Sequence, residues 1–199
     1  MTSLAGTLRA LAIAAAMACS PGAWADLTPD EAAAALRSGG YVLYFRHAGT
    51  DFSQNDARMT SFDDCTTQRN LTDRGRDDAR VIGAAIRALG IPIGRVRASP
   101  YCRTIETAVL AFGRAEKSSA VRGSPLQAED PERYRALREL LAQPPSPGVN
   151  DVIVSHGNPF AAVAGPPYLA EGEAAVVEPA GGGFRVVARI RAGEWPAGN

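Results

Sequence analysis

Histidine, cysteine and lysine are scarce in this chain of 199 residues, which has two histidines, three cysteines and, in Lys117, a single lysine. Two histidines and no Cys-x-x-Cys pair exclude a plausible zinc cluster and leave only carboxylates as ligands, for magnesium. A basic excess is also absent, because 21 Lys and Arg balance 21 Asp and Glu. Nucleic acid and anionic membranes are therefore not expected as main partners, and any anion-binding site must be local.

The first 25 residues have the composition of a signal peptide. They contain no Asp or Glu, and Arg9 precedes an apolar run of small residues, Ala10–Ala18, that is too short to span a bilayer. Ala23-Trp24-Ala25 then fits the small-x-small rule for cleavage before Asp26. We expect an exported protein, periplasmic or secreted, whose mature chain has lost Arg9 and is slightly acidic.

The mature chain, residues 26–199, is expected to form one domain, because no repeat or linker divides it and it is long enough for a substantial core. The composition of the full sequence, 46% hydrophobic and 21% charged, is typical of a globular protein. A monomer is the default for an exported domain of this size. A lipoprotein with Cys19 as the lipidated residue is the alternative, although Ala16-Met17-Ala18 is a poor lead-in for that processing.

Buried strands alternate with amphipathic helices along the mature chain. The continuous apolar runs at 41–45 and 152–154 are typical of strands that are covered on both faces. This alternation predicts a three-layer α/β/α domain with a central, mostly parallel sheet. The other expected elements are helices over about 29–38 and 73–89, helices starting near 100 and near 131, a short strand at 96–99, and a terminal hairpin of 174–177 with 184–190.

Each histidine follows the C-terminal end of one of the two predicted central strands, His47 directly after Arg46 and His156 directly before Gly157. In open α/β sheets, ligands bind in the crevice beyond these strand ends. A single histidine in such a place is more often a hydrogen-bonded structural residue, and Arg46 by itself is readily explained as a solvated side chain. Two histidines in equivalent positions favour a shared functional site, and Gly157 permits close approach of the backbone to a ligand.

Four motifs between residues 41 and 160 resemble those of the histidine phosphatase superfamily, which includes the phosphoglycerate mutases. None of them is specific alone, but four in the right order make a specific match, and the resemblance implies a phosphoglycerate mutase-like fold. The motifs are Arg46-His47-Ala48 with Thr50, Leu71-Thr72-Asp73-Arg74-Gly75 followed by Ala79, Ser99-Pro100-Tyr101-Cys102-Arg103-Thr104 with Thr107-Ala108, and Val154-Ser155-His156-Gly157-Asn158.

The resemblance implies catalysis through a phosphohistidine intermediate on His47. Arg46 and Arg103 would hold the phosphoryl oxygens with their planar guanidinium groups. His156 would donate a proton to one of these oxygens, and Thr50 would add a hydroxyl donor, with a local loop hydrogen bond as an equal alternative for Thr50. Two guanidinium and two imidazole groups neutralise a phosphate dianion, so neither a metal nor another cofactor is expected.

The proton donor for the leaving group is less clearly indicated. Larger members of the family place a glutamate between the second arginine and the second histidine, and Glu129 is the best candidate in that region. Asp130 is better explained as a helix cap before Pro131. Glu173, near the terminal hairpin, is a further candidate.

Cys65 and Cys102 remain as an even pair after removal of the signal peptide. Cys65 lies in the long loop after His47, and Cys102 directly precedes Arg103. A disulfide would pin this loop beside the phosphate site, and an oxidising compartment would preserve it. The alternative is two unrelated buried thiols.

The sequence thus predicts an exported, metal-independent phosphomonoesterase that acts on a small-molecule or protein-linked phosphate. One alternative is a non-catalytic protein of the same fold that binds a phosphate ligand or the cell envelope. A phosphomutase is a further alternative, but only 52 residues lie between Arg103 and His156, which leaves little chain for a large lid.

Overall fold

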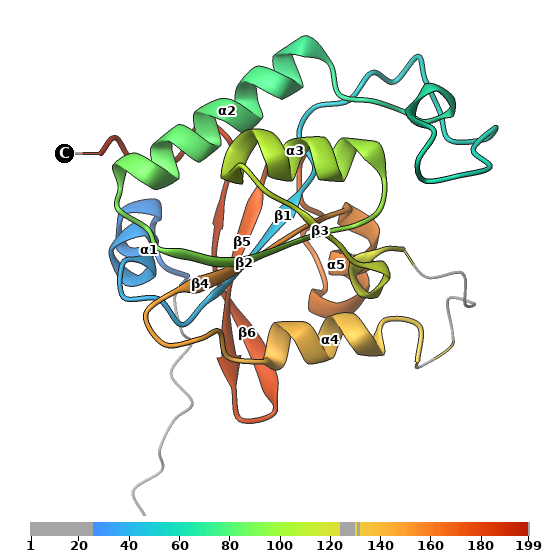
Figure 1. The fold of residues 1–199 in the computed structure, drawn as a ribbon. Helices are drawn as coiled ribbons and strands as arrows, with labels where there is room; N and C mark the ends of the chain where they lie inside the picture. The colour runs from blue at the N-terminus through green and yellow to red at the C-terminus, as the bar shows by residue number, and fades with distance from the viewer. Residues whose placement is uncertain (1–25, 124–129, 131, 199) are drawn as a thin grey trace, which may run out of the picture.

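A sheet of six strands runs through the described part of the chain, residues 26–123, 130 and 132–198, in the computed structural model (Figure 1). The strand order is β3-β2-β4-β1-β5-β6. β1 to β4 pair in parallel, and β5 and β6 form the predicted antiparallel hairpin beside β1. The strands are β1 (Val42–Arg46), β2 (Ile93–Ala98), β3 (Glu116–Lys117), β4 (Asn150–Ser155), β5 (Ala174–Ala180) and β6 (Gly183–Ile190).

Helices cover both faces of the sheet, which confirms the predicted three-layer α/β/α architecture (Figure 1). Leu43 and Phe45 of β1 pack into a core with the first three helices, whereas Val42 and Tyr44 face a second core with the last two. Burial on both faces explains why the apolar run of β1 is continuous rather than alternating. The helices are α1 (Pro29–Leu36), α2 (Asp73–Ala88), α3 (Cys102–Phe112), α4 (Arg135–Ala142) and α5 (Gly157–Ala164), with 3-10 turns η1 (Cys65–Thr67) and η2 (Ser119–Val121).

The first two helices begin where the sequence predicts. Thr28 and Glu31 form a reciprocal capping box at the start of α1. The hydroxyl of Thr72 accepts a hydrogen bond of 2.9 Å from the backbone N–H of Gly75 and caps α2. Both caps satisfy N–H groups that the first helical turn leaves without a partner.

The predicted start of the fourth helix near residue 131 is wrong, because α4 begins at Arg135. Asp130 caps a turn instead: its carboxylate accepts a hydrogen bond from the backbone N–H of Glu132, and its carbonyl accepts one from Arg133. Tyr134, with φ −132° and ψ 27°, interrupts the helical path between this turn and α4. Helix α5 has no counterpart among the expected elements.

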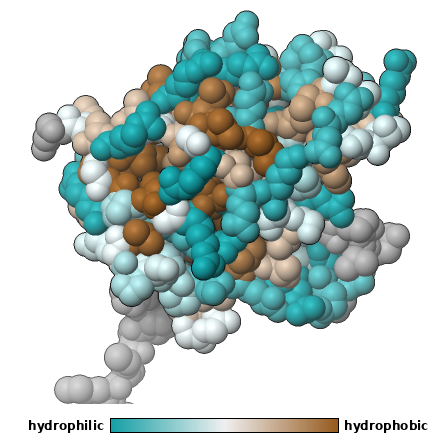
Figure 2. Space-filling model, viewed as in Figure 1, coloured by the Kyte–Doolittle hydropathy of each residue, from teal (hydrophilic) through white to brown (hydrophobic). Residues whose placement is uncertain are grey.

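Hydrophilic residues cover much of the surface in Figure 2, and hydrophobic residues show between them toward the middle of the view. No helix in the described part of the chain is long and apolar enough to cross a membrane. The predicted signal peptide, Cys19 and Glu129 lie outside the described residues.

Candidate active site

The register of β1 and β4 brings the two histidines together. Arg46 lies opposite Ser155 in the parallel pair, and the backbone N–H of His47 donates to the Ser155 carbonyl at 2.9 Å. The next residues, His47 and His156, therefore leave the sheet side by side at the C-terminal ends of the strands. Their ring centroids are 5.6 Å apart. The structure thus places both histidines where the sequence analysis expected a shared site.

The His47 ring is held in one tautomer. Its Nδ1 lies 2.9 Å from the carbonyl oxygen of Ala48, which can only accept a hydrogen bond, so Nδ1 carries the proton and Nε2 keeps its lone pair. Burial lowers the pKa of His47 to about 3, together with the positive charges of Arg103, Arg46 and Arg69 and against the opposing effect of the Ala48 hydrogen bond. The imidazole is therefore neutral and nucleophilic at physiological pH.

Polar contacts hold both the backbone and the ring of His156 in place. The Ser99 hydroxyl lies 2.9 Å from Nε2, and the Tyr44 hydroxyl donates to the His156 carbonyl at 2.7 Å. Burial lowers the pKa of His156 well below its usual value, and the nearby Arg103 acts in the same direction. A phosphate dianion between these groups would oppose both effects and favour a protonated His156.

Arg46 reaches the site from the end of β1. Its Nη1 donates to the Leu169 carbonyl at 2.9 Å, and its Nη2 donates to Glu171 at 3.3 Å. These contacts hold the guanidinium beside His47 and fix its direction. Arg46 lines the same cavity as both histidines, as the sequence analysis predicted.

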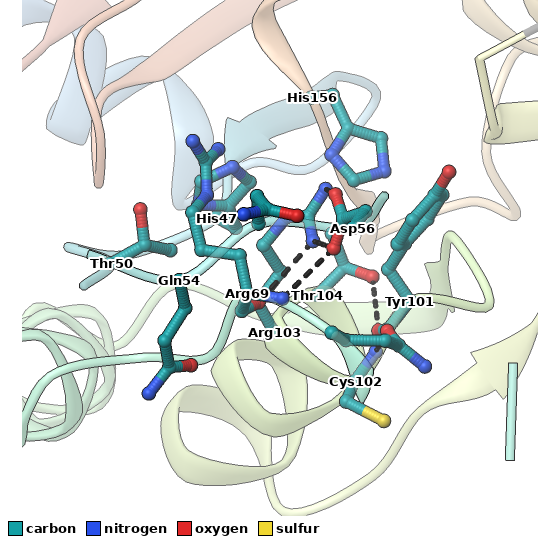
Figure 3. Close-up of polar contacts among 12 residues, drawn as sticks. His47, Thr50, Gln54, Asp56, Arg69, Tyr101, Cys102, Arg103, Thr104 and His156 are labelled. Atoms are coloured by element: carbon teal, nitrogen blue, oxygen red, sulfur yellow. Dashed lines mark hydrogen bonds and ion pairs between the residues drawn. The ribbon is translucent and has the colours of Figure 1, made fainter. Parts of the chain in front are cut away.

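Arg103, in the first turn of α3, is 5% exposed and forms an ion pair with Asp56 (Figure 3). Two nitrogens of the guanidinium each lie 3.0 Å from a different oxygen of this carboxylate. Asp56 also accepts a hydrogen bond of 2.9 Å from the backbone N–H of Arg69. Burial acts to raise the pKa of Asp56, but these hydrogen bonds and charges hold it below its usual value. The carboxylate is thus ionised where a phosphate oxygen would otherwise meet Arg103.

The hydroxyl of Thr50 donates to Glu171 at 2.7 Å, and the backbone N–H of Thr50 donates to the same carboxylate at 3.0 Å. In this structure the partner of Thr50 is thus Glu171 and not a neighbour in its own loop. Glu171 joins Thr50 to Arg46 and lies 3.9 Å from Nδ1 of His47. Glu171 thus holds Thr50 and Arg46 in position next to His47.

A cavity of about 630 Å³ contains both histidines and five arginines. Asp56 is the one carboxylate among its lining residues in the described part of the chain. The positive charge of the cavity lining is thus largely uncompensated by other lining residues. The lining residues are Arg46, His47, Asn55, Asp56, Arg69, Tyr101, Arg103, Arg122, Gly123, Arg133, Tyr134, His156, Gly157, Asn158, Pro159 and Tyr168.

Glu173, one of the two candidate proton donors, does not line this cavity. Glu173 is 8% exposed, and its carboxylate accepts a hydrogen bond of 2.6 Å from the backbone N–H of Ala170. Glu129 lies outside the described residues and stays a sequence-based prediction. The described residues also contain no group of three or more His, Cys, Asp and Glu side chains arranged to hold a metal ion.

The predicted disulfide between Cys65 and Cys102 is present in the structure and joins η1 to the start of α3. The Gln68 side chain reinforces this connection, because its oxygen accepts a hydrogen bond of 3.0 Å from the Cys102 backbone N–H. The loop after β1 is thereby anchored next to Arg103.

The sequence analysis missed five charged residues at the site: Asp56, Arg69, Arg122, Arg133 and Glu171. Asp56 and Arg69 belong to the long polar loop after His47, where no motif singles them out. Glu171 is two residues from Glu173, which was considered as an acid. Only the contacts with Arg46 and Thr50 distinguish the two glutamates.

No family model matches this sequence, and no curated protein matches it. Solved structures do match. The protein histidine phosphatase SixA in complex with tungstate has a TM-score of 0.50 at 20% identity over 76% of this chain and 97% of its own. Phosphoserine phosphatase from Entamoeba histolytica has a TM-score of 0.54 at 13% identity over 78% and 99%. The mycobacterial glucosyl-3-phosphoglycerate phosphatase has a TM-score of 0.50 at 16% identity over 77% and 99%.

The chain has the phosphoglycerate mutase-like fold of the histidine phosphatases. At these identities the similarity is one of fold, and a fold does not fix a function. The histidine phosphatase fold does account for the place of the site, because it sets His47 and His156 at the C-terminal edge of adjacent parallel strands.

Proposed function

We propose that this protein is an exported phosphomonoesterase that hydrolyses a phosphate ester through a phosphohistidine on His47. The observation that carries the proposal is the fixed tautomer of His47. Its Nε2 lone pair is available beside Arg46, Arg103 and His156 in one cavity. A neutral, buried imidazole next to guanidinium groups suits attack on a phosphate dianion.

The reaction takes place in two displacements. In the first, Nε2 of His47 forms a bond to phosphorus, the ester P–O bond breaks, and the leaving oxygen takes a proton from the general acid, for which Glu129 is the proposed residue. In the second, water attacks the phosphohistidine and gives a proton back to that residue, the P–N bond breaks, and inorganic phosphate leaves while His47 becomes neutral again. Arg46 and Arg103 neutralise the equatorial oxygens, and His156 donates to one of them.

Binding of the substrate requires Arg103 to exchange partners. The phosphate dianion replaces the Asp56 carboxylate at the guanidinium, so the loop that carries Asp56 has to shift. The guanidinium groups supply the positive charge that phosphoryl transfer needs, and we propose that turnover requires no metal ion.

Export is part of the same proposal. The Cys65–Cys102 disulfide supports it, because such bonds persist in oxidising compartments. Fractionation of the native host, with mass spectrometry of the mature N-terminus, should find the protein outside the cytoplasm and beginning at Asp26. A cytoplasmic protein that keeps residues 1–25 would contradict export and leave the hydrolytic activity untouched.

Hydrolysis of an aryl phosphate by the mature protein in the presence of a chelator tests the activity. We expect turnover without added metal and a loss of at least about a thousandfold in His47→Ala. Rapid quenching should trap an acid-labile, alkali-stable phosphoryl label on the wild-type protein alone. Circular dichroism establishes that the variant is folded.

Other outcomes assign a different function. Binding of inorganic phosphate without turnover of any phosphate ester would identify a non-catalytic phosphate-binding protein. Transfer of phosphate between two positions of one molecule, without net release, would identify a phosphomutase. Activity that the chelator abolishes would contradict metal independence.

A further inference from the structure

Besides Arg46, Arg103 and the loop residue Arg69, the cavity carries two further arginines that the chemistry at His47 does not use. Arg122 follows η2, Arg133 precedes α4, and both line the cavity. We propose that Arg122 and Arg133 bind a second anionic group of the substrate, either a carboxylate or another phosphate. The preferred substrates are then phosphate monoesters with a second anionic group. This inference rests on the proposed function, because it takes the His47 end of the cavity as the place of reaction.

A row of aromatic rings leads from the histidines to Arg122. The ring of His156 contacts Tyr101, with centroids 4.8 Å apart, and Tyr101 contacts Phe62 at 5.0 Å. The Arg122 guanidinium lies over Phe62, 5.4 Å from its centroid. Arg122 is therefore connected to His156 through two intervening rings, those of Tyr101 and Phe62. The cation–π contact restricts the guanidinium before any ligand arrives.

Arg133 is held in a similar way. Its guanidinium lies 5.0 Å from the ring centroid of Tyr134, which is 6% exposed and also lines the cavity. Its backbone N–H donates to the Asp130 carbonyl at 3.0 Å. The Nε atom of Arg133 is buried without a hydrogen-bond partner among the described residues. Buried polar groups usually have partners, and an anion in the cavity would supply one.

Arg122 and Arg133 differ from Arg46 and Arg103 in whether a carboxylate neutralises the guanidinium charge. Each of the latter forms an ion pair with a carboxylate. Arg122 and Arg133 form no ion pair in the described part of the chain, where the only carboxylate of the cavity lining, Asp56, is bound to Arg103. A phosphate dianion at Arg46 and Arg103 displaces Asp56. The five arginines of the lining still exceed the dianion and Asp56 together by two positive charges, which another anionic group can neutralise.

The alternative explanation is a general positive field that draws every phosphate into the cavity. Such a field raises association rates for all anions and is strongly screened by salt. A subsite instead discriminates between substrates that differ only in the group at the far end. The experiment therefore compares substrates with the same reacting phosphate.

Alkanediol monophosphates of increasing chain length provide this comparison. At each length, the far end is a hydroxyl, a carboxylate or a second phosphate, and release of phosphate gives kcat/KM. We expect one of the anionic ends to raise kcat/KM at least about tenfold over the hydroxyl end at the best length, because one charge-assisted contact contributes about 1.5–3 kcal/mol. The carboxylate and phosphate series show which anion the subsite prefers.

Arg122→Gln and Arg133→Gln should each remove part of this advantage, and the double variant should abolish it. Arg80→Gln is the matched control, because Arg80 pairs with Asp77 on the surface of α2, outside the cavity. The same total charge is lost there, and the advantage should remain. Preference for the anionic end should also persist when the salt concentration is raised at constant pH.

The inference is overturned if no chain length shows an advantage, if the advantage survives in the double variant, or if Arg80→Gln reduces it equally. Failure of the proposed function has a separate signature, namely hydrolysis of the hydroxyl-ended esters that His47→Ala does not affect. If no ester is hydrolysed, calorimetric binding still tests the subsite. Bisphosphates should then bind at least about tenfold more tightly than the matched monophosphates in the wild type but not in the double variant.

Discussion

The carboxylate of Asp56 meets the guanidinium of Arg103 through two N–O distances of 3.0 Å. This is the two-point contact that a guanidinium also makes with a phosphate. Asp56 therefore occupies the Arg103 guanidinium, which binds the substrate phosphate in the proposed reaction. Because Asp56 belongs to the loop that Cys65 anchors to α3, the loop and the phosphate compete for Arg103.

Substitution of Asp56 by Asn should strengthen binding of phosphate. The variant keeps the shape of the side chain and the acceptor for the Arg69 backbone N–H, but it removes the competing negative charge. We expect the inhibition constant of inorganic phosphate to fall about tenfold, in line with the usual strength of a hydrogen bond to a charged group. Competitive inhibition of aryl phosphate hydrolysis measures it.

Asp63→Asn is the matched control, because Asp63 pairs with the exposed Lys117 outside the cavity, and it should leave the inhibition constant unchanged. A different result would assign Asp56 another role. If kcat falls in Asp56→Asn while the inhibition constant stays the same, Asp56 supplies the proton to the leaving group.

Removal of the Cys65–Cys102 disulfide should destabilise the protein. The bond spans 37 residues, for which chain entropy gives about 4 kcal/mol at 25 °C. We expect a reducing agent to lower the melting temperature and to raise KM, because the start of α3 then holds Arg103 less firmly. Thiol titration of the unfolded, unreduced mature protein should find no free thiol.

The Cys65→Ser, Cys102→Ser double variant provides the control for this prediction. It should resemble the reduced wild type and show no further response to the reducing agent. Two free thiols in the unreduced wild-type protein would contradict the disulfide.

Burial of His47 should make the protein less stable in acid. The pKa of His47 is about 3 in the folded state and 6.5 in the unfolded chain, so the unfolded chain binds more protons between these pH values. The contribution of a neutral His47 is complete above pH 6.5 and is lost as the pH falls toward 3, by up to about 1.4 kcal/mol per pH unit.

Urea unfolding of the wild type and of His47→Gln at several pH values measures this contribution. The variant should lose stability less steeply below pH 6.5, because its glutamine does not titrate. Parallel curves for the two proteins over the whole range would show that His47 titrates normally in the folded state.

Substitution of Thr50 by Val tests what its hydroxyl does. The hydroxyl donates to Glu171 in the structure, so its loss should lower the free energy of unfolding by about 1 kcal/mol and change KM less than about twofold. Steady-state kinetics and urea unfolding give the two values. A tenfold rise in KM at unchanged stability would instead place the hydroxyl on the phosphate.

The pattern of local residues was enough to predict most of the fold. The apolar run of β1 indicated burial on both faces, and the caps at Thr28 and Thr72 marked the starts of two helices. The start of α4 was not predictable in this way, since Asp130 caps a turn as readily as a helix, and the conformation of Tyr134 decides between them.

For the site, the sequence by itself determined which groups we propose to carry the chemistry and where along the chain they lie. Arg46, His47, Arg103 and His156 were identifiable because each lies at a strand end or helix start within a motif. Tertiary structure alone decided their partners. The contact of Asp56 with Arg103 spans 47 residues of sequence, and that of Thr50 with Glu171 spans 121. Such pairs depend on how loops pack at one edge of the sheet, and no local pattern records that packing.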